Sequence, residues 1–195
     1  MKKSLINVPN ALTLFRALCI LPIALCILWK WYLAGFILLV LAGISDILDG
    51  LLAKTWQITT AFGAWFDTIT DKILVFVSLL ALYSSNDPLI STADFLWITS
   101  RESVIILTRF ILKRFGMELR VNMWGKIKFW VQVISLLAIL VHRGIVAVPR
   151  IEELIWLMKW ATIISGLIYL LETATKIFAT VTEKKVAEYS KQKTI

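Results

Sequence analysis

Four aspartates lie close together in a chain that is otherwise strongly apolar, with 59% hydrophobic residues. They are Asp46, Asp49, Asp67 and Asp71. A charged side chain at membrane depth costs roughly 3 kcal/mol, so four carboxylates require a compensating cation or a polar cavity. Spacings of three and four residues put both members of each pair on one helix face. Carboxylate oxygens suit Mg²⁺ or Mn²⁺, which commonly shares its coordination with substrate phosphates. The pattern therefore predicts phosphate chemistry in a membrane protein.

The aspartates belong to a longer pattern with fixed spacing. It reads Asp46-x2-Asp49-Gly50-x2-Ala53-Lys54-x8-Gly63-x3-Asp67-x3-Asp71. This string resembles the signature of the CDP-alcohol phosphatidyltransferases, D-x2-D-G-x2-A-R-x8-G-x3-D-x3-D. Only Lys54 departs from it, and lysine keeps the positive charge of arginine but loses its planar fork of donors. The alternative, a solvated acidic loop, does not account for Gly50, Ala53 and Gly63 at the family's spacing.

Three further segments resemble the bacterial members of this family that make phosphatidylglycerol phosphate. The first runs from Asn7 to Arg16 and is similar to their N-P-N-x-L-T-x-x-R opening. The second is Arg101-Glu102 with Arg109, and the third is Trp124-Gly125-Lys126-Ile127-Lys128 with Gln132. The resemblance extends to about residue 135, and the last third of the chain is generic.

The resemblance implies a role for each acidic residue and for the donor substrate's neighbours. Asp46, Asp49 and Asp67 would hold the divalent cation. Asp71 would lie near the metal as well and take the proton of the attacking hydroxyl. The residues implied in binding CDP-diacylglycerol are Asn10, Thr13, Gly50, Lys54 and Thr60. For Asn10 and Thr13 the alternative is helix capping, and for Lys54 it is a lysine that extends to the membrane interface.

A basic set in the middle of the chain predicts a phosphorylated acceptor. Arg101, Arg109 and Lys126 are assigned to the acceptor phosphate, while Lys128 is expected to contribute least. Charge-assisted hydrogen bonds from such residues suit phosphate. The alternative is the basic bias of cytosolic loops, with Arg101 or Arg109 paired to Glu102.

The expected function is transfer of a phosphatidyl group from CDP-diacylglycerol to sn-glycerol 3-phosphate, with Mg²⁺ or Mn²⁺ as cofactor. Inositol phosphate, serine or phosphatidylglycerol is the alternative acceptor. A cation- or proton-coupled transporter is a further alternative, but its acidic groups would usually lie near the midplane on several spans. No nucleic-acid partner is indicated.

The apolar runs predict an all-helical membrane protein with one domain over residues 1–195 and a polar tail from about 184 to 195. Six spans of roughly 20 residues are expected, as a hydrocarbon core of about 30 Å requires. They are Leu12–Trp29, Tyr32–Leu48, Gly63–Tyr83, Phe95–Leu112, Ile127–Val141 and Leu154–Phe178. The loops on the aspartate side carry most lysines and arginines, which predicts that this side faces the cytosol of a bacterial inner membrane. The family resemblance also implies a homodimer.

Overall fold

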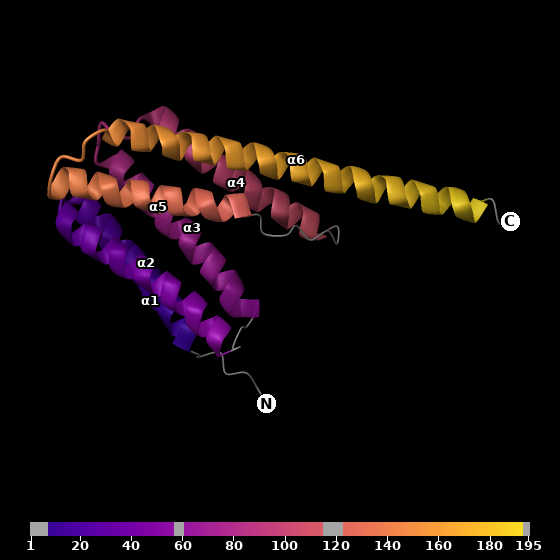
Figure 1. Cartoon of the computed structure of the whole chain (residues 1–195), viewed down its shortest axis with the longest axis horizontal. Helices are drawn as coiled ribbons and strands as arrows, with labels where there is room; N and C mark the ends of the chain where they lie inside the picture. The colour runs from indigo at the N-terminus through magenta and orange to yellow at the C-terminus, as the bar shows by residue number, and fades with distance from the viewer. Residues whose placement is uncertain (1–7, 57–60, 115–122, 193–195) are drawn as a thin grey trace.

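The computed structural model describes residues 8–56, 61–114 and 123–192, which form six α-helices (Figure 1). They are α1 (Val8–Leu28), α2 (Tyr32–Thr55), α3 (Ala61–Ser84), α4 (Thr92–Arg114), α5 (Met123–Gly144) and α6 (Ile151–Gln192). The described residues contain no strand. Each helix contains one of the six predicted segments almost entirely, so the all-helical prediction is confirmed.

Four helices are long and apolar enough to cross a membrane. The qualifying stretches are Asn10–Leu28, Tyr32–Ala53, Ile127–Gly144 and Ile151–Phe178. α3 and α4 are not among the qualifying helices, and they contain the charged residues Asp67, Asp71, Arg101 and Glu102. The chain is therefore an integral membrane protein with at least four candidate spans in its described part, and the six-span arrangement stays a prediction.

One end of the molecule is closed by three tight connections. The residues Lys30, Asn86 and Arg150 have φ angles of 61°, 54° and 56°, and each lies between two consecutive helices. Such left-handed residues reverse the chain within a few positions. A Cβ at Gly144 would lie 2.7 Å from the Cβ of Tyr32, so glycine allows the end of α5 to pack on the start of α2.

A buried ion pair also fastens the closed end. Arg143 donates from Nε to Asp87 Oδ2 at 2.9 Å and from Nη2 to Oδ1 at 2.7 Å. Asp87 Oδ1 also accepts from the backbone N–H of Leu89 at 2.9 Å. These bonds tie the α3–α4 connection to the last turn of α5, and the two-donor geometry suits a guanidinium–carboxylate pair.

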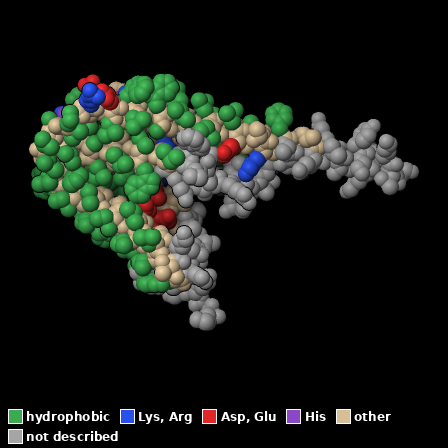
Figure 2. All heavy atoms as spheres, in the orientation of Figure 1, with side chains coloured by type: hydrophobic (Ala, Val, Ile, Leu, Met, Phe, Trp, Pro, Cys, Tyr) green, Lys and Arg blue, Asp and Glu red, His purple; other side chains and the backbone are tan. Residues whose placement is uncertain are grey.

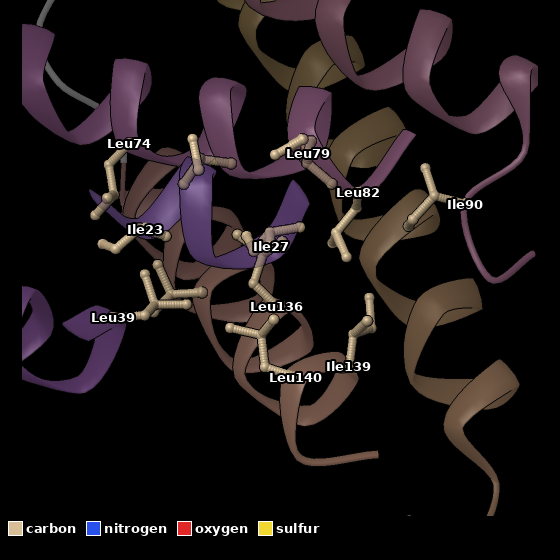
Figure 3. Packing of buried hydrophobic residues seen from close by; sticks show 14 of the residues in the cluster. Ile23, Ile27, Leu39, Leu74, Leu79, Leu82, Ile90, Leu136, Ile139 and Leu140 are labelled. Atoms are coloured by element: carbon tan, nitrogen blue, oxygen red, sulfur yellow. The ribbon is translucent and has the colours of Figure 1, made fainter. Parts of the chain in front are cut away.

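The hydrophobic core joins α1, α2, α3 and α5 (Figure 3) and also includes Ile98 of α4 and Ile155 of α6. Aliphatic side chains from these helices meet there, among them Ile23, Ile27, Leu39, Leu79, Leu136 and Leu140. Each of these side chains is at most 1% exposed. This packing holds the helices together beside the closed end, while many other apolar side chains face outward. Outward apolar side chains are expected where lipid is the solvent.

Away from the closed end the helices form two arms (Figure 1). α1 packs against α2 and α3, while α6 packs against α4 and α5. The arms diverge from the closed end, and acidic side chains gather in the hollow between them (Figure 2). The fold therefore leaves a polar site between two groups of helices.

Candidate active site

The four aspartates converge from two neighbouring helices. Asp46 and Asp49 lie on α2, and Asp67 and Asp71 lie on α3. One carboxylate oxygen from each of Asp46, Asp49 and Asp67 lies within 4.8 Å of the other two. The two helix faces that carry the aspartate pairs therefore converge in the structure. Asp71 lines the same cavity beside them.

A guanidinium from α1 reaches the acidic cluster. The Arg16 side chain is only 1% exposed. Its Nη1 lies 2.8 Å from Asp46 Oδ1 and 2.8 Å from Asp67 Oδ1, and its Nη2 lies 2.5 Å from Asp49 Oδ2. Nη1 also contacts Asp71. One positive charge therefore lies against four carboxylates, which leaves the group of five side chains with three negative charges when all are ionised.

Removing the Arg16 charge is expected to destabilise the metal-free protein. Arg16→Met would leave four neighbouring carboxylates without their countercharge, and breaking a buried ion pair costs about 3 kcal/mol or more. The variant should melt at a lower temperature than wild type in EDTA, and added Mg²⁺ should raise its melting temperature more than it raises that of wild type.

Arg150→Met is the matched control, because Arg150 is 80% exposed and its contact with Glu153 is 3.7 Å long. Equal melting temperatures for Arg16→Met and wild type in EDTA would contradict the countercharge role.

The acidic cluster fits a divalent cation. Oxygen ligands of one Mg²⁺ at about 2.1 Å lie roughly 3.0 to 4.2 Å apart in an octahedron. The spread of at most 4.8 Å among Asp46, Asp49 and Asp67 oxygens is close to this range, so small side-chain rotations suffice. The donors are all carboxylates, which favours Mg²⁺ or Mn²⁺ over softer metals.

The aspartates share a cavity of about 400 Å³ with a set of basic residues that form its basic wall. The aspartates line one part of it, and Lys72, Arg101 and Lys128 line another, with Glu102 between the last two. Arg101 Nη1 donates to Glu102 Oε1 at 2.8 Å, and Lys128 Nζ contacts the same oxygen. Arg101 therefore pairs with Glu102, as one alternative predicted, and still lines the cavity. The two walls can hold a cation and an anionic group side by side.

Three of the residues predicted to bind the donor substrate have surroundings that the structure describes, namely Asn10, Thr13 and Gly50. Thr13 is the sixth residue of α1 and donates to Asp49 Oδ2 at 3.2 Å, so helix capping is wrong for it. Asn10 is half-buried in the first turn of α1. Gly50 lines the cavity, and a Cβ added there would meet open space in the described structure. Packing against the described residues therefore does not explain Gly50, whereas close approach of a ligand would.

Four predicted residues lie wholly or partly outside the described structure. Thr60 falls in the undescribed segment 57–60. Lys54, Arg109 and Lys126 belong to α2, α4 and α5, but their side chains are not described. Their predicted roles stay predictions.

Other site residues were missed by the sequence reasoning. Arg16 was noted only as the end of a motif, although a charge in an apolar segment is a signal of function. Lys128 was expected to contribute least, yet it is buried and lines the cavity. Ser165 and Tyr169 on α6 also line it, and they come from the part of the chain that seemed generic.

The fold and the site define a class of protein: a helical membrane protein whose polar cavity combines an acidic cluster that fits a divalent cation with a basic wall. The chain belongs to the CDP-alcohol phosphatidyltransferase family, whose sequence model matches residues 6–178. It is thus an enzyme of this family, as the sequence pattern predicted.

Several curated relatives carry the name CDP-diacylglycerol–glycerol-3-phosphate 3-phosphatidyltransferase. The protein of that name from Bacillus subtilis (strain 168) is 31% identical over 179 residues, covering 82% of this chain and 91% of the relative. That from Rickettsia felis is 31% identical over 170 residues, covering 84% and 93%. That from Pectobacterium atrosepticum is 33% identical over 140 residues, covering 69% and 76%.

Proposed function

We propose that this protein transfers the phosphatidyl group of CDP-diacylglycerol to sn-glycerol 3-phosphate, giving phosphatidylglycerol phosphate and CMP. The observation that carries the proposal is that the aspartates line one cavity together with Arg101 and Lys128. The acidic part suits a cation that accompanies the pyrophosphate of the donor. The basic part suits the phosphate of the acceptor. The names of the relatives support the same pair of substrates.

In this reaction the acceptor hydroxyl oxygen attacks the phosphorus that carries the diacylglycerol. The new P–O bond forms there, and the bond between that phosphorus and the bridging pyrophosphate oxygen breaks, so CMP leaves with the bridging oxygen. Asp71 accepts the hydroxyl proton, as a positioned general base does. When bound, Mg²⁺ or Mn²⁺ held by Asp46, Asp49 and Asp67 supplies positive charge that offsets the charge developing on the transferred group.

A phosphorylated acceptor is favoured over a neutral alcohol by the charges of the cavity. Arg101, Lys128 and Lys72 carry three positive charges against one on Glu102, and a neutral alcohol would not require them. Inositol phosphate shares the phosphate and is the alternative acceptor, whereas serine and phosphatidylglycerol match the basic wall less well.

CMP release by the purified protein tests this proposal. The protein in detergent would receive Mg²⁺, CDP-diacylglycerol and one acceptor at a time from a panel of sn-glycerol 3-phosphate, inositol phosphate, serine and phosphatidylglycerol. We expect release with sn-glycerol 3-phosphate. Release only with another member of the panel would overturn the acceptor, and no release with any acceptor would overturn the reaction.

We also propose that the cavity faces the cytosol of a bacterial inner membrane and that the enzyme is a homodimer. The basic residues concentrated at the aspartate end support the orientation, because cytosolic loops are enriched in lysine and arginine. The helix lengths give the depth: Arg16 lies 12 residues before the end of α1, which corresponds to about 18 Å from the closed end. In a core of about 30 Å this puts the aspartates in the cytosolic half.

The one departure from the family signature, Lys54, gives a further prediction. If Lys54 contacts a phosphate of CDP-diacylglycerol, Lys54→Ala should raise the KM for that substrate about tenfold, the scale of one charge-assisted hydrogen bond. Lys54→Arg should be tolerated or lower the KM, because the guanidinium fork matches phosphate. Steady-state kinetics in detergent at fixed ionic strength would measure both. An unchanged KM for Lys54→Ala would identify Lys54 as an interfacial anchor instead.

A further inference from the structure

The last helix, α6, packs closely against Arg101, a residue of the basic wall. Gly166 of α6 lies against Arg101 of α4, and a Cβ added at Gly166 would lie 3.3 Å from Arg101 Cγ and 3.6 Å from Arg101 Nε. A Cβ contact of 3.3 Å requires the arginine to shift by a few tenths of an ångström. Glycine at this position therefore gives the Arg101 side chain the space through which it reaches the cavity.

The neighbouring residue holds the tip of the same side chain. Ser165 is 4% exposed, and its Oγ accepts a hydrogen bond from Arg101 Nη2 at 2.8 Å. The Ser165 hydroxyl in turn donates to the carbonyl oxygen of Thr162 at 3.1 Å. Because this donation fixes the hydroxyl proton, the oxygen lone pairs face the guanidinium.

Glu102 holds the opposite corner of the guanidinium. Arg101 Nη1 donates to Glu102 Oε1 at 2.8 Å, so the planar group is held at both terminal nitrogens, by α4 on one side and by α6 on the other. A guanidinium has five N–H groups. Two are used by these bonds, and Nε is buried with no partner in the described part of the chain. Arg101 also lines the cavity that contains the aspartates.

We propose that Ser165 and Gly166 are positioning residues that orient Arg101 for the phosphate of the acceptor, so that α6 sets acceptor affinity. The inference rests on the proposed function. A planar fork binds phosphate well only in the correct orientation, and a guanidinium held at two corners loses less freedom on binding. α6 would then affect the binding of the acceptor but not the binding of the donor substrate.

Two substitutions separate this role from a general structural one. Gly166→Ala shifts the Arg101 side chain, and Ser165→Ala removes the acceptor of the Nη2 hydrogen bond. Each is expected to raise the KM for sn-glycerol 3-phosphate about tenfold, the scale of one hydrogen bond to a charged group. The KM for CDP-diacylglycerol should stay unchanged. The inhibition constant of inorganic phosphate, measured against sn-glycerol 3-phosphate, should rise by a similar factor. Ser165→Thr keeps the hydroxyl and should restore the wild-type KM.

Matched controls are available on other helices. Gly43→Ala on α2 adds a Cβ that meets open space, and Ser103→Ala on α4 removes an exposed hydroxyl that bonds only its own helix. Both should leave both KM values unchanged. Parallel increases in the donor and acceptor KM values for Gly166→Ala and Ser165→Ala would overturn the positioning role, and so would wild-type values for both. If wild type itself releases no CMP with sn-glycerol 3-phosphate, the proposed function fails instead.

Discussion

Asp46→Asn, Asp49→Asn and Asp67→Asn are each expected to lower turnover at ordinary Mg²⁺ by roughly 10²-fold or more, because each removes a carboxylate that we expect to be a ligand of the cation. Their carboxylate oxygens already lie within 4.8 Å of one another. An amide oxygen is a weaker ligand for a hard cation than a carboxylate, so the defect should lie mainly in metal binding, and excess Mn²⁺ should partly restore activity.

The measurement is a titration of activity with Mg²⁺ and Mn²⁺, together with direct Mn²⁺ binding by electron paramagnetic resonance. Asp94→Asn is the control, since Asp94 pairs with Lys159 at 2.7 Å and does not line the active-site cavity. Near-normal turnover at ordinary Mg²⁺ in a folded variant of any of the three residues would show that the residue is not a ligand.

The second large effect is expected at Asp71. Asp71→Asn should reduce kcat by roughly 10²-fold or more, the scale of a positioned general base, with little change in the affinity for CDP-diacylglycerol. Asp71 lines the cavity beside the three-aspartate group and contacts Arg16. Its carboxylate is thus near the expected cation and open to the acceptor.

The comparison to make is kcat against the dissociation constant of the nucleotide lipid, for Asp71→Asn and Asp67→Asn side by side. The two variants differ if Asp71 takes the proton and Asp67 holds the metal. A loss of donor binding in proportion to turnover in Asp71→Asn would assign Asp71 to the metal and leave the proton to another group.

Local pattern was enough to predict the helices and the acidic cluster. Apolar runs and turn residues determine where each helix lies, and spacings of three and four bring the aspartates to one face of their helices. Helix ends were predicted less well: the second span was expected to end at Leu48, whereas α2 continues to Thr55. The charged residues Asp49 and Lys54 lower the hydropathy there without ending the helix.

The contacts between helices could not be predicted from the same pattern. Arg16 reaches the aspartates because α1 packs on both α2 and α3, and Ser165 reaches Arg101 because α6 packs on α4. Neither pairing can be inferred from the residue spacing within a single segment. For Arg16 the signal was a charge inside an apolar run, whereas Ser165 and Gly166 are residue types that occur throughout membrane helices.

The length of α6 has a consequence for how the protein sits in lipid. Its candidate span Ile151–Phe178 has 28 residues, which corresponds to about 42 Å of helix against a hydrocarbon core of about 30 Å, and charged residues lie near both of its ends, at Glu152, Glu153, Glu172 and Lys176. A span of this length is accommodated by tilting of the helix or by extension of its end charges to the interfaces. Ser165 lies in the middle of this stretch, so any change in the tilt of α6 moves the oxygen that holds Arg101. Bilayer thickness would thereby affect the orientation of Arg101 in the cavity.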